Sequence, residues 1–529
     1  MKNVSLIKSI LTVGGFTMVS RVTGFIRDVL IANFLGAGML ADAFFVAFKL
    51  PNLFRSLFAE GAFNVAFVPL FSELTETKGR EKALSFATEA FSALFYVLFA
   101  FVALMETFMP VAVMIQAPGF VENPEKLAAT VFMSRITFPY LLLISLNSLQ
   151  SGMLNSVGKF AAAALTPTFL NLTMISSLFV FAPVFGNNFA VSLSVGVSLA
   201  GIFQLLWLVW HTRRAGLPLG LVSPLKALKN VSEEVRTLMK RILPGVFGSG
   251  IYQINLFLDT LFVSFLSTGA VSWLYYANRL YQLPVGIIGA AVGTALLPIL
   301  TRQLKSGDAE EAEKSMHKAL YFAVFISMPC AAGLAALNYP VISVLFERGA
   351  FTAEAAGKTG LALSAYVIGL PAYILTKTLA PAFYARSDTA TPVRIAATAL
   401  IVYVALCLVF LPVLGYVGIA LATGVVAWIN VGQYVFYIRR RQWHTLPKQL
   451  AYRMGAVAIS SAVMGVLTHF AYRFSLTCFP DWQHAAVLTR FSVLGGLIAV
   501  GIVLFCLLIL ITGGIDKTAL KAILAHKAK

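Results

Sequence analysis

Charged residues are scarce in this sequence. Only 12% of its 529 residues are Asp, Glu, Lys or Arg, whereas 59% are hydrophobic and the mean hydropathy is +0.84. That composition excludes a soluble fold of this length. The four cysteines and six histidines show no CxxC, HExxH or other metal-ligand spacing. We interpret the cysteines as apolar packing residues, and we expect neither a metal site nor a cofactor.

Long apolar stretches are what the sequence has in abundance. Runs of roughly 20 apolar residues, bounded by short polar segments, recur along the whole chain, which is the pattern of an all-α polytopic membrane protein. We predict fourteen transmembrane helices. They run over residues 10–35, 43–71, 83–115, 127–154, 161–182, 190–210, 243–266, 271–300, 319–337, 359–383, 396–411, 417–437, 455–470 and 491–511.

The distribution of Lys and Arg predicts how these spans are oriented. Lys2 and Lys8 precede the first span, and the basic residues of later loops gather on the same side. Because an even number of spans places both termini on one side, we predict that both are cytoplasmic. The net charge of +18 then lies at the membrane surface beside anionic lipids. No basic soluble domain remains to bind nucleic acid.

Weak self-similarity at an offset of about 230 residues indicates an internal duplication. The segment LGAGMLADAFFVAFKLP resembles LSTGAVSWLYYANRLYQLP, and FVPLFSEL resembles LLPILTRQL. We therefore predict two pseudo-symmetric lobes of six helices, over residues 1–215 and 241–441. A cytoplasmic linker over 216–240 would join them, and 442–529 would hold two further helices and a cytoplasmic tail.

Charged residues interrupt the first two predicted spans, where a membrane helix is normally uncharged. A charge near the bilayer centre costs on the order of 3 kcal/mol, so it persists only beside a partner or a water-filled cavity. At 100° per residue, the charges of each span fall on one face of its helix. We therefore predict a polar path through the membrane. The residues concerned are Arg21, Arg27, Asp28, Asp42, Lys49, Arg55 and Glu60.

The second half adds Asp259, Arg279 and Lys377 at membrane depth. Among these ten residues six cations stand against four acids, and a surplus of two positive charges favours an anionic ligand. Arginine binds phosphate with a planar, permanently charged fork, so phosphate or diphosphate is the predicted ligand.

Structural alternatives stay open for several of these residues. Arg27 with Asp28, and Arg55 with Glu60, could be internal ion pairs that fix helix contacts. Asp42 could cap the start of its own helix. Asp259 could couple transport to an ion or pair with Arg279.

Several long strings of this sequence resemble the MurJ (MviN) family of lipid II flippases. They are SRVTGFIRD, GAGMLADAFFVAFKLPNLFRSLFAEGAFNVAFVPLFSE, YANRLYQLPVGIIGAAVGTALLP and LAPAFYARSDTATP. The resemblance implies the fold of the multidrug/oligosaccharidyl-lipid/polysaccharide exporter superfamily, with two six-helix lobes in a V around a cationic cavity and two C-terminal helices. It implies as substrate the undecaprenyl-diphosphate-linked disaccharide pentapeptide of peptidoglycan.

Site roles follow from the same resemblance. It implies Arg21, Arg27, Arg55 and Arg279 as cavity arginines, with Asp28 and Glu60 as acids that orient them. Asp42, Lys49, Asn278 and Lys377 are expected to line the cavity or to gate it, and Asp259 to couple an ion. Asn278 stands where many relatives carry Asp, so charge coupling beside Arg279 is expected to differ. We expect a monomer in the bacterial inner membrane whose partners are lipid II, membrane lipids and a coupling cation.

Other function classes are disfavoured by the same residues. A multidrug exporter of the same superfamily would need acids to dominate its cavity. A flippase for another polyprenyl-linked glycan shares the diphosphate chemistry, and only the family strings argue against it. A membrane enzyme would need an acid cluster or a nucleophile with its base, and no such set is present at plausible spacing. We therefore predict a transporter without catalytic residues.

Overall fold

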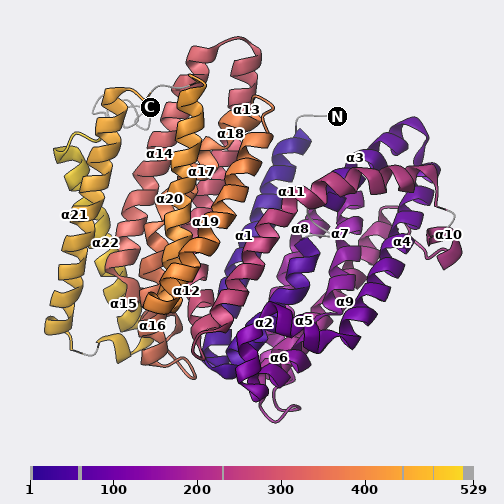
Figure 1. The fold of residues 1–529 in the computed structure, drawn as a ribbon, viewed down its shortest axis with the longest axis horizontal. Coiled ribbons are helices and arrows are strands. Elements are labelled where there is room, and N and C mark those ends of the chain that lie inside the picture. Colours follow the sequence, from indigo (N-terminus) through magenta and orange to yellow (C-terminus); the bar gives the residue numbers. More distant parts are fainter. Residues whose placement is uncertain (1–3, 57–61, 229–230, 444–445, 481, 516–529) are drawn as a thin grey trace. The chain divides into compact units, whose positions relative to one another are not determined.

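The computed structural model describes residues 4–56, 62–228, 231–443, 446–480 and 482–515, and the secondary structure in these ranges is helical throughout (Figure 1). This confirms the predicted all-α class. Runs of apolar residues explain the result, because only a helix satisfies every backbone polar group within a single membrane-spanning segment.

The helices follow one another along the chain with short connections. Their bounds are α1 Val4–Leu35, α2 Met39–Arg55, α3 Ala62–Thr77, α4 Arg80–Thr107, α5 Met109–Gln116, η2 Pro118–Glu122, α6 Pro124–Thr137, α7 Tyr140–Ser156, α8 Phe160–Val180, α9 Phe189–Arg214, α10 Pro224–Leu228, α11 Glu233–Ser264, α12 Ala270–Pro284, η3 Val285–Gly289, α13 Ala290–Lys305, α14 Ala309–Ala336, α15 Asn338–Phe346, α16 Ala353–Ile368, α17 Leu370–Leu379, α18 Pro381–Tyr384, α19 Ala390–Leu414, α20 Tyr416–Arg440, α21 Lys448–Cys478, η4 Trp482–His484 and α22 Val487–Ile511.

Within the described residues, eleven helical stretches are long and apolar enough to cross a membrane. They match eleven of the fourteen predicted spans. The predicted spans over 10–35, 43–71 and 243–266 are not among them, although helices α1, α2, α3 and α11 cover these regions. These three spans are the ones that carry Arg21, Arg55 and Asp259, together with the other charges of the first half. The count of fourteen stays a prediction.

The chain divides into two compact units. The first comprises residues 1–272 and 348–351, and the second comprises 273–347 and 352–529. In the first unit α1 packs along α8, α8 along α9, α2 against α6, and α11 against α3. Its core includes a stack of phenylalanines in which Phe67 lies 5.4–5.7 Å, centroid to centroid, from Phe63, Phe71 and Phe86.

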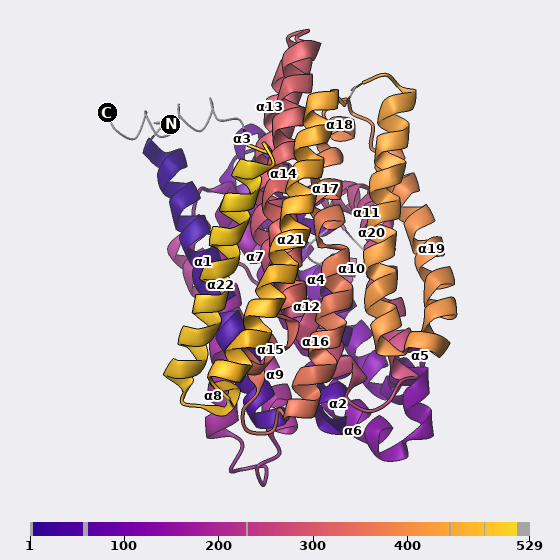
Figure 2. The ribbon, with the colours of Figure 1, turned by 90° about the vertical axis from the view of Figure 1, so that its left-hand side faces the viewer.

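The second unit is built around α14, which packs against α21, α17 and α13. Helix α20 packs against α19, α16 and α17. The two C-terminal helices α21 and α22 lie side by side in this unit (Figure 2). Helix α11 groups with the first unit, whereas our lobe boundary assigns it to the second lobe. The lobe limits therefore stay a prediction.

A break in helical geometry lies between α12 and α13. Pro284 ends α12, and residues Val285–Gly289 form a single π-helical turn, η3. Proline removes one backbone donor and clashes with the preceding turn, which explains why the regular helix stops there. Such turns are frequent at functional sites.

Candidate functional site

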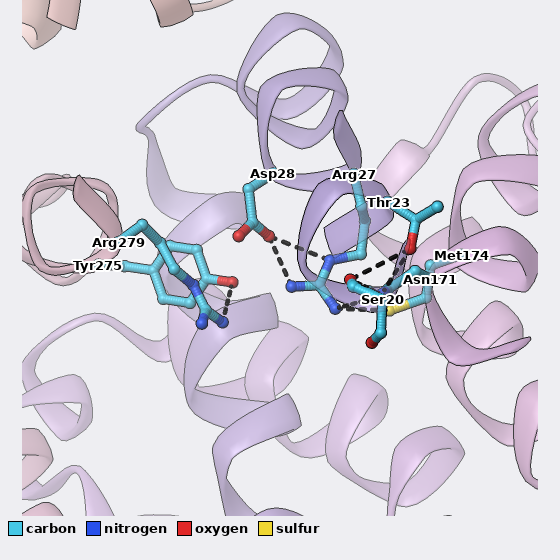
Figure 3. Close-up of polar contacts among 8 residues, drawn as sticks. All are labelled: Ser20, Thr23, Arg27, Asp28, Asn171, Met174, Tyr275 and Arg279. Carbon is cyan, nitrogen blue, oxygen red and sulfur yellow. Dashed lines mark hydrogen bonds and ion pairs between the residues drawn. The ribbon is translucent and has the colours of Figure 1, made fainter. Parts of the chain in front are cut away.

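Arg27 lies at the centre of a buried polar network in the first unit (Figure 3). Its Nε and Nη2 atoms donate to Oδ1 of Asp28 at 3.0 and 2.7 Å, and its Nη1 donates to Oδ1 of Asn171 on α8 at 2.9 Å. Arg27 and Asp28 are only 6% and 3% exposed. The ion pair that the sequence allowed is therefore present, and a third residue joins it.

Asn171 fixes the arginine because its own amide is held by α1. Its Nδ2 donates to the backbone carbonyl of Ser20 at 2.9 Å and to Oγ1 of Thr23 at 3.2 Å. The two helices meet at Gly24, where a Cβ would lie 3.3 Å from the same Nδ2. A larger residue at position 24 would crowd the amide that orients Arg27.

Arg21 lies on the same helix as Arg27 and directly follows Ser20, whose carbonyl accepts from Asn171. Its side chain is exposed, in contrast to the buried Arg27. The first unit thus holds one arginine whose charge is balanced by an adjacent carboxylate and one whose guanidinium is accessible.

Asp42 on α2 is fully buried and accepts four hydrogen bonds. Lys126 of α6 donates to Oδ2 at 2.8 Å, and the backbone N–H of Gly269 donates to the same atom at 2.7 Å. The backbone N–H and the hydroxyl of Ser272 donate to Oδ1 at 3.0 and 2.7 Å. Asp42 does not cap its own helix, whose N-cap is Gly38. It accepts instead from the start of α12, so that alternative was wrong.

The end of α2 carries one further predicted residue, Arg55. Arg55 is partly buried, and its Nε donates to Oδ1 of Asn52 at 3.2 Å. Ser56, which follows it, accepts a hydrogen bond from Nε2 of Gln253 on α11 at 2.7 Å. The predicted partner Glu60 lies outside the described residues, so the suggested pair with Arg55 stays a prediction.

Lys49 and Asp259 are a second pair of oppositely charged residues in the first unit. Lys49 lies on α2 and is partly buried, and its ammonium interacts electrostatically with the carboxylate of Asp259 on α11. This places Asp259 where its charge can compensate a lysine. Its suggested role in ion coupling stays a prediction.

In the second unit, the guanidinium of Arg279 stacks on the ring of Tyr275, one turn earlier in α12. The guanidinium carbon is 4.7 Å from the centroid of the tyrosine ring, and Nη2 donates to the hydroxyl at 2.8 Å (Figure 3). Asn278 accepts a hydrogen bond from Nε2 of Gln282 at 3.1 Å. The side chain of Asn278 therefore bonds to the next turn of α12.

Lys377 on α17 extends past the π-helical turn of the second unit. Its aliphatic stem lies against Gly289, where a Cβ would be 2.8 Å from Cδ of the lysine. The side chain is exposed beyond that contact. Gly289 thus leaves the space that the lysine stem occupies beside η3.

Sequence reasoning missed Asn171, Lys126 and Tyr275. Asn171 is a single amide in an apolar predicted span. Its isolation there could have indicated a polar partner within the protein. Lys126 stands in the first turn of α6 after a proline and resembles an ordinary loop cation. Among the described residues, no group of three or more His, Cys, Asp or Glu side chains could hold a metal ion.

Comparison with known proteins bears on this arrangement. The family model "Lipid II flippase MurJ" matches residues 31–485. A probable lipid II flippase MurJ of Rhizobium tropici is 41% identical over 528 residues, covering 99% of this chain and 97% of the relative. The chain belongs to the MurJ family. A lipid II flippase MurJ of Burkholderia cenocepacia is 34% identical, covering 89% of this chain and 92% of the relative.

Solved structures agree with the MurJ assignment at the level of the fold. A lipid II flippase MurJ in an inward closed conformation matches with a TM-score of 0.76 and 26% identity, over 94% of this chain and 97% of that one. An inward-facing multidrug resistance transporter of the MATE family matches with a TM-score of 0.60 and 14% identity, over 82% and 94%. The second likeness concerns the fold alone.

Proposed function

We propose that this chain moves lipid II from the cytoplasmic to the periplasmic leaflet of the bacterial inner membrane by alternating access, with its arginines holding the diphosphate. Its relatives are named as flippases for this lipid. In this proposal the headgroup enters the protein while the polyprenyl tail stays in the bilayer, and both termini are cytoplasmic. The chain would act as a monomer without catalysing a reaction.

The observation that carries the proposal is the charge balance once Asp42 is assigned. Because Lys126 neutralises Asp42, that acid no longer offsets the cations of the predicted site. In the first unit Arg21, Arg27, Lys49 and Arg55 stand against Asp28, Asp259 and Glu60. In the second unit Arg279 and Lys377 remain. Each unit by itself therefore has a surplus of positive charge, which favours an anionic cargo.

Arg27 is proposed to change partners during the cycle. In the structure, Asp28 and Asn171 accept hydrogen bonds from its guanidinium. A phosphate oxygen can replace the carboxylate because both accept the planar fork of arginine. Asp28 would then take the arginine back as the cargo leaves, so binding would not be too tight for release. A diphosphate without such neutralisation would not cross the hydrocarbon region, since burying bare charge costs many kcal/mol.

Two further features support movement of the helices around a bound headgroup. Pro51 lies inside α2, and the turn η3 follows Pro284, so both helices have positions at which they can bend. Asp42, Lys49, Asn278 and Lys377 are proposed to line or gate the path. Asp259 is proposed to bind a coupling cation when Lys49 is turned away from it.

The alternatives differ in the charge that they require. A multidrug exporter of this fold would carry apolar cations and would need an acidic cavity, which the surplus of arginine and lysine opposes. A flippase for another polyprenyl-linked glycan would use the same diphosphate contacts. Only the cargo found at the outer leaflet separates it from a lipid II flippase.

The proposal is tested in cells depleted of their own lipid II flippase. The chain should restore growth and externally accessible lipid II, whereas Arg21→Ala, Arg55→Ala and Arg279→Ala should restore neither at equal expression. Arg213→Ala, which removes an exposed arginine at the end of α9, serves as the matched control and should behave like the unchanged chain. Correct insertion without recovery of lipid II outside would refute this cargo.

A further inference from the structure

Two turns of the first half recur in the second half with the same hydrogen bonds. After α7, the N–H of Gly158 donates to the Asn155 carbonyl and that of Lys159 to the Leu154 carbonyl. After α18, the N–H groups of Ser387 and Asp388 donate in the same way, to Tyr384 and Phe383. The ends of α9 and α20 form a second matching pair, at residues 216–217 and 442–443. Their spacing of 226–229 residues agrees with the predicted duplication.

The matching turns differ in the residues that occupy the left-handed position. In the first half these are Gly158 and Gly216, with φ of 77° and 70°. In the second half they are Ser387 and Gln442, with φ of 60° and 54°. Only three non-glycine residues in the described part of the chain have positive φ, and these are two of them. Such conformations are disfavoured and gather at functional positions.

Trp443 joins the two turns of the second half. The guanidinium carbons of Arg386 and Arg441 lie 4.4 and 4.8 Å from the centroid of its ring. Asp388 forms an ion pair with Arg441 and also accepts from the N–H and hydroxyl of Thr391 at 3.0 and 2.7 Å. Although burial alone would raise the pKa of Asp388, these hydrogen bonds and Arg441 lower it to about 2. Arg441 is therefore neutralised.

Arg386 is the cation of this cluster that no acid of the described residues neutralises. Its Nη1 donates to the backbone carbonyl of Ala382 at 2.9 Å, and its guanidinium is partly buried against the tryptophan. Burial lowers the pKa of Arg386, which is the sign of a charge held out of water. Three exposed arginines lie close to the cluster in sequence. Arg394 is in α19, and Arg439 and Arg440 are the last residues of α20.

The surface beside the cluster is suited to lipid chains. Helix α19 begins two residues after Asp388, and apart from Arg394 and Thr398 its exposed side chains are apolar. They include Val393, Ile401, Leu408, Val409 and Val413, which are 46–79% exposed. A half-buried cation stacked on tryptophan at the end of such a helix matches the membrane–water interface, where tryptophan and arginine gather.

We propose that Arg386, supported by Trp443, binds the phosphate of an anionic phospholipid whose chains lie along α19. Arginine can bind a phosphate with its remaining donors while stacking on the ring. Asp388 neutralises Arg441, which stacks on the same ring, and leaves Arg386 as the ligand-binding group. The site lies wholly within the second unit and does not depend on which cargo the protein moves.

The test is a titration of the full-length protein in detergent with dioleoyl phosphatidylglycerol, followed by native mass spectrometry. Arg386→Gln should weaken binding of the first lipid about tenfold, the size expected for one charged hydrogen-bonded contact. Arg386→Lys should retain part of the affinity, since it keeps the charge. Asp388→Asn should strengthen binding because it removes the nearest negative charge. Arg213→Gln removes an exposed arginine from the matching turn of the first half and should leave binding unchanged.

Four results would overturn the proposal. An equal loss in Arg213→Gln would show that lipid is held by diffuse surface charge. Unchanged binding in Arg386→Gln, with a normal elution profile, would show that another group holds the phosphate. Displacement of phosphatidylglycerol by millimolar inorganic phosphate would indicate a site for free anions. Dioleoyl phosphatidylcholine should bind more weakly than phosphatidylglycerol, and equal binding would also count against the proposal.

Discussion

Asp28 and Asp42 are buried carboxylates of the same unit, yet their surroundings differ in kind. Asp28 accepts from the arginine beside it on α1. Asp42 accepts from Lys126, from two backbone N–H groups and from a hydroxyl, which come from parts of the chain far from α2. Backbone donors cannot leave without unfolding a helix end, whereas an arginine side chain can rotate toward another anion. The contacts of Asp28 therefore suit a change of partner, whereas those of Asp42 suit a permanent link between α2, α6 and the start of α12.

The comparison is tested most strongly by Asp42→Asn. This change leaves the Lys126 ammonium, which is 4% exposed, without its counter-charge. Breaking a buried pair by removing one partner should lower the free energy of unfolding by about 3 kcal/mol. The loss is measured as a lower thermal midpoint of the purified protein in detergent.

Two variants control this prediction. Asp42→Asn combined with Lys126→Met removes both charges and should recover much of the loss. Asp308→Asn changes an acid whose Oδ1 caps α14 by accepting from the backbone N–H of Glu311, and because asparagine caps a helix about as well as aspartate it should cost less than about 1 kcal/mol. If Asp42→Asn lowers the thermal midpoint no more than Asp308→Asn does, the contacts of Asp42 do not stabilise the fold.

How far the sequence could predict these networks depends on the distance between partners along the chain. Arg27 and Asp28 are adjacent, so their pairing could be anticipated. Lys126 lies 84 residues from Asp42, and nothing local distinguishes it from a loop cation. The helices themselves were predictable because hydrophobic periodicity is local. The span 10–35 was likewise predicted from its apolar run in spite of its charges, and α1 covers it.

Arg27→Gln combined with Asp28→Asn gives the next largest effect. The amide pair keeps the net charge and can keep a hydrogen bond, so the fold should survive. Transport should fall at least about tenfold because a charged contact to the diphosphate is lost. The measurement is lipid II exposed to the outside in depleted cells. Arg213→Ala, which removes an exposed arginine at the end of α9, is the control and should transport normally. Normal transport by Arg27→Gln combined with Asp28→Asn would mean that this pair is only structural.

Asn171→Leu should have a smaller effect that reports on positioning. The change removes the acceptor that holds Nη1 of Arg27 and the donor to Ser20. Arg27 would then sample more orientations, so the lipid II concentration for half-maximal transport in proteoliposomes should rise several-fold, as expected for one lost hydrogen bond to a charged group. Thr166→Val, on the same helix, loses only a bond to its own helix and should leave that concentration unchanged. An equal rise in both variants would assign Asn171 to packing.

Tyr275→Phe should have the smallest effect, and it extends the comparison to the second unit. The phenyl ring still stacks on Arg279, but the 2.8 Å hydrogen bond from Nη2 to the hydroxyl is lost. Because stacking on the ring face remains, half-maximal transport should shift only about twofold. Tyr275→Leu removes the ring as well and should shift it further, toward the effect of Asn171→Leu. If Tyr275→Phe were as damaging as Tyr275→Leu, the hydroxyl would be what positions Arg279, and this arginine would be held by a hydrogen bond as Arg27 is.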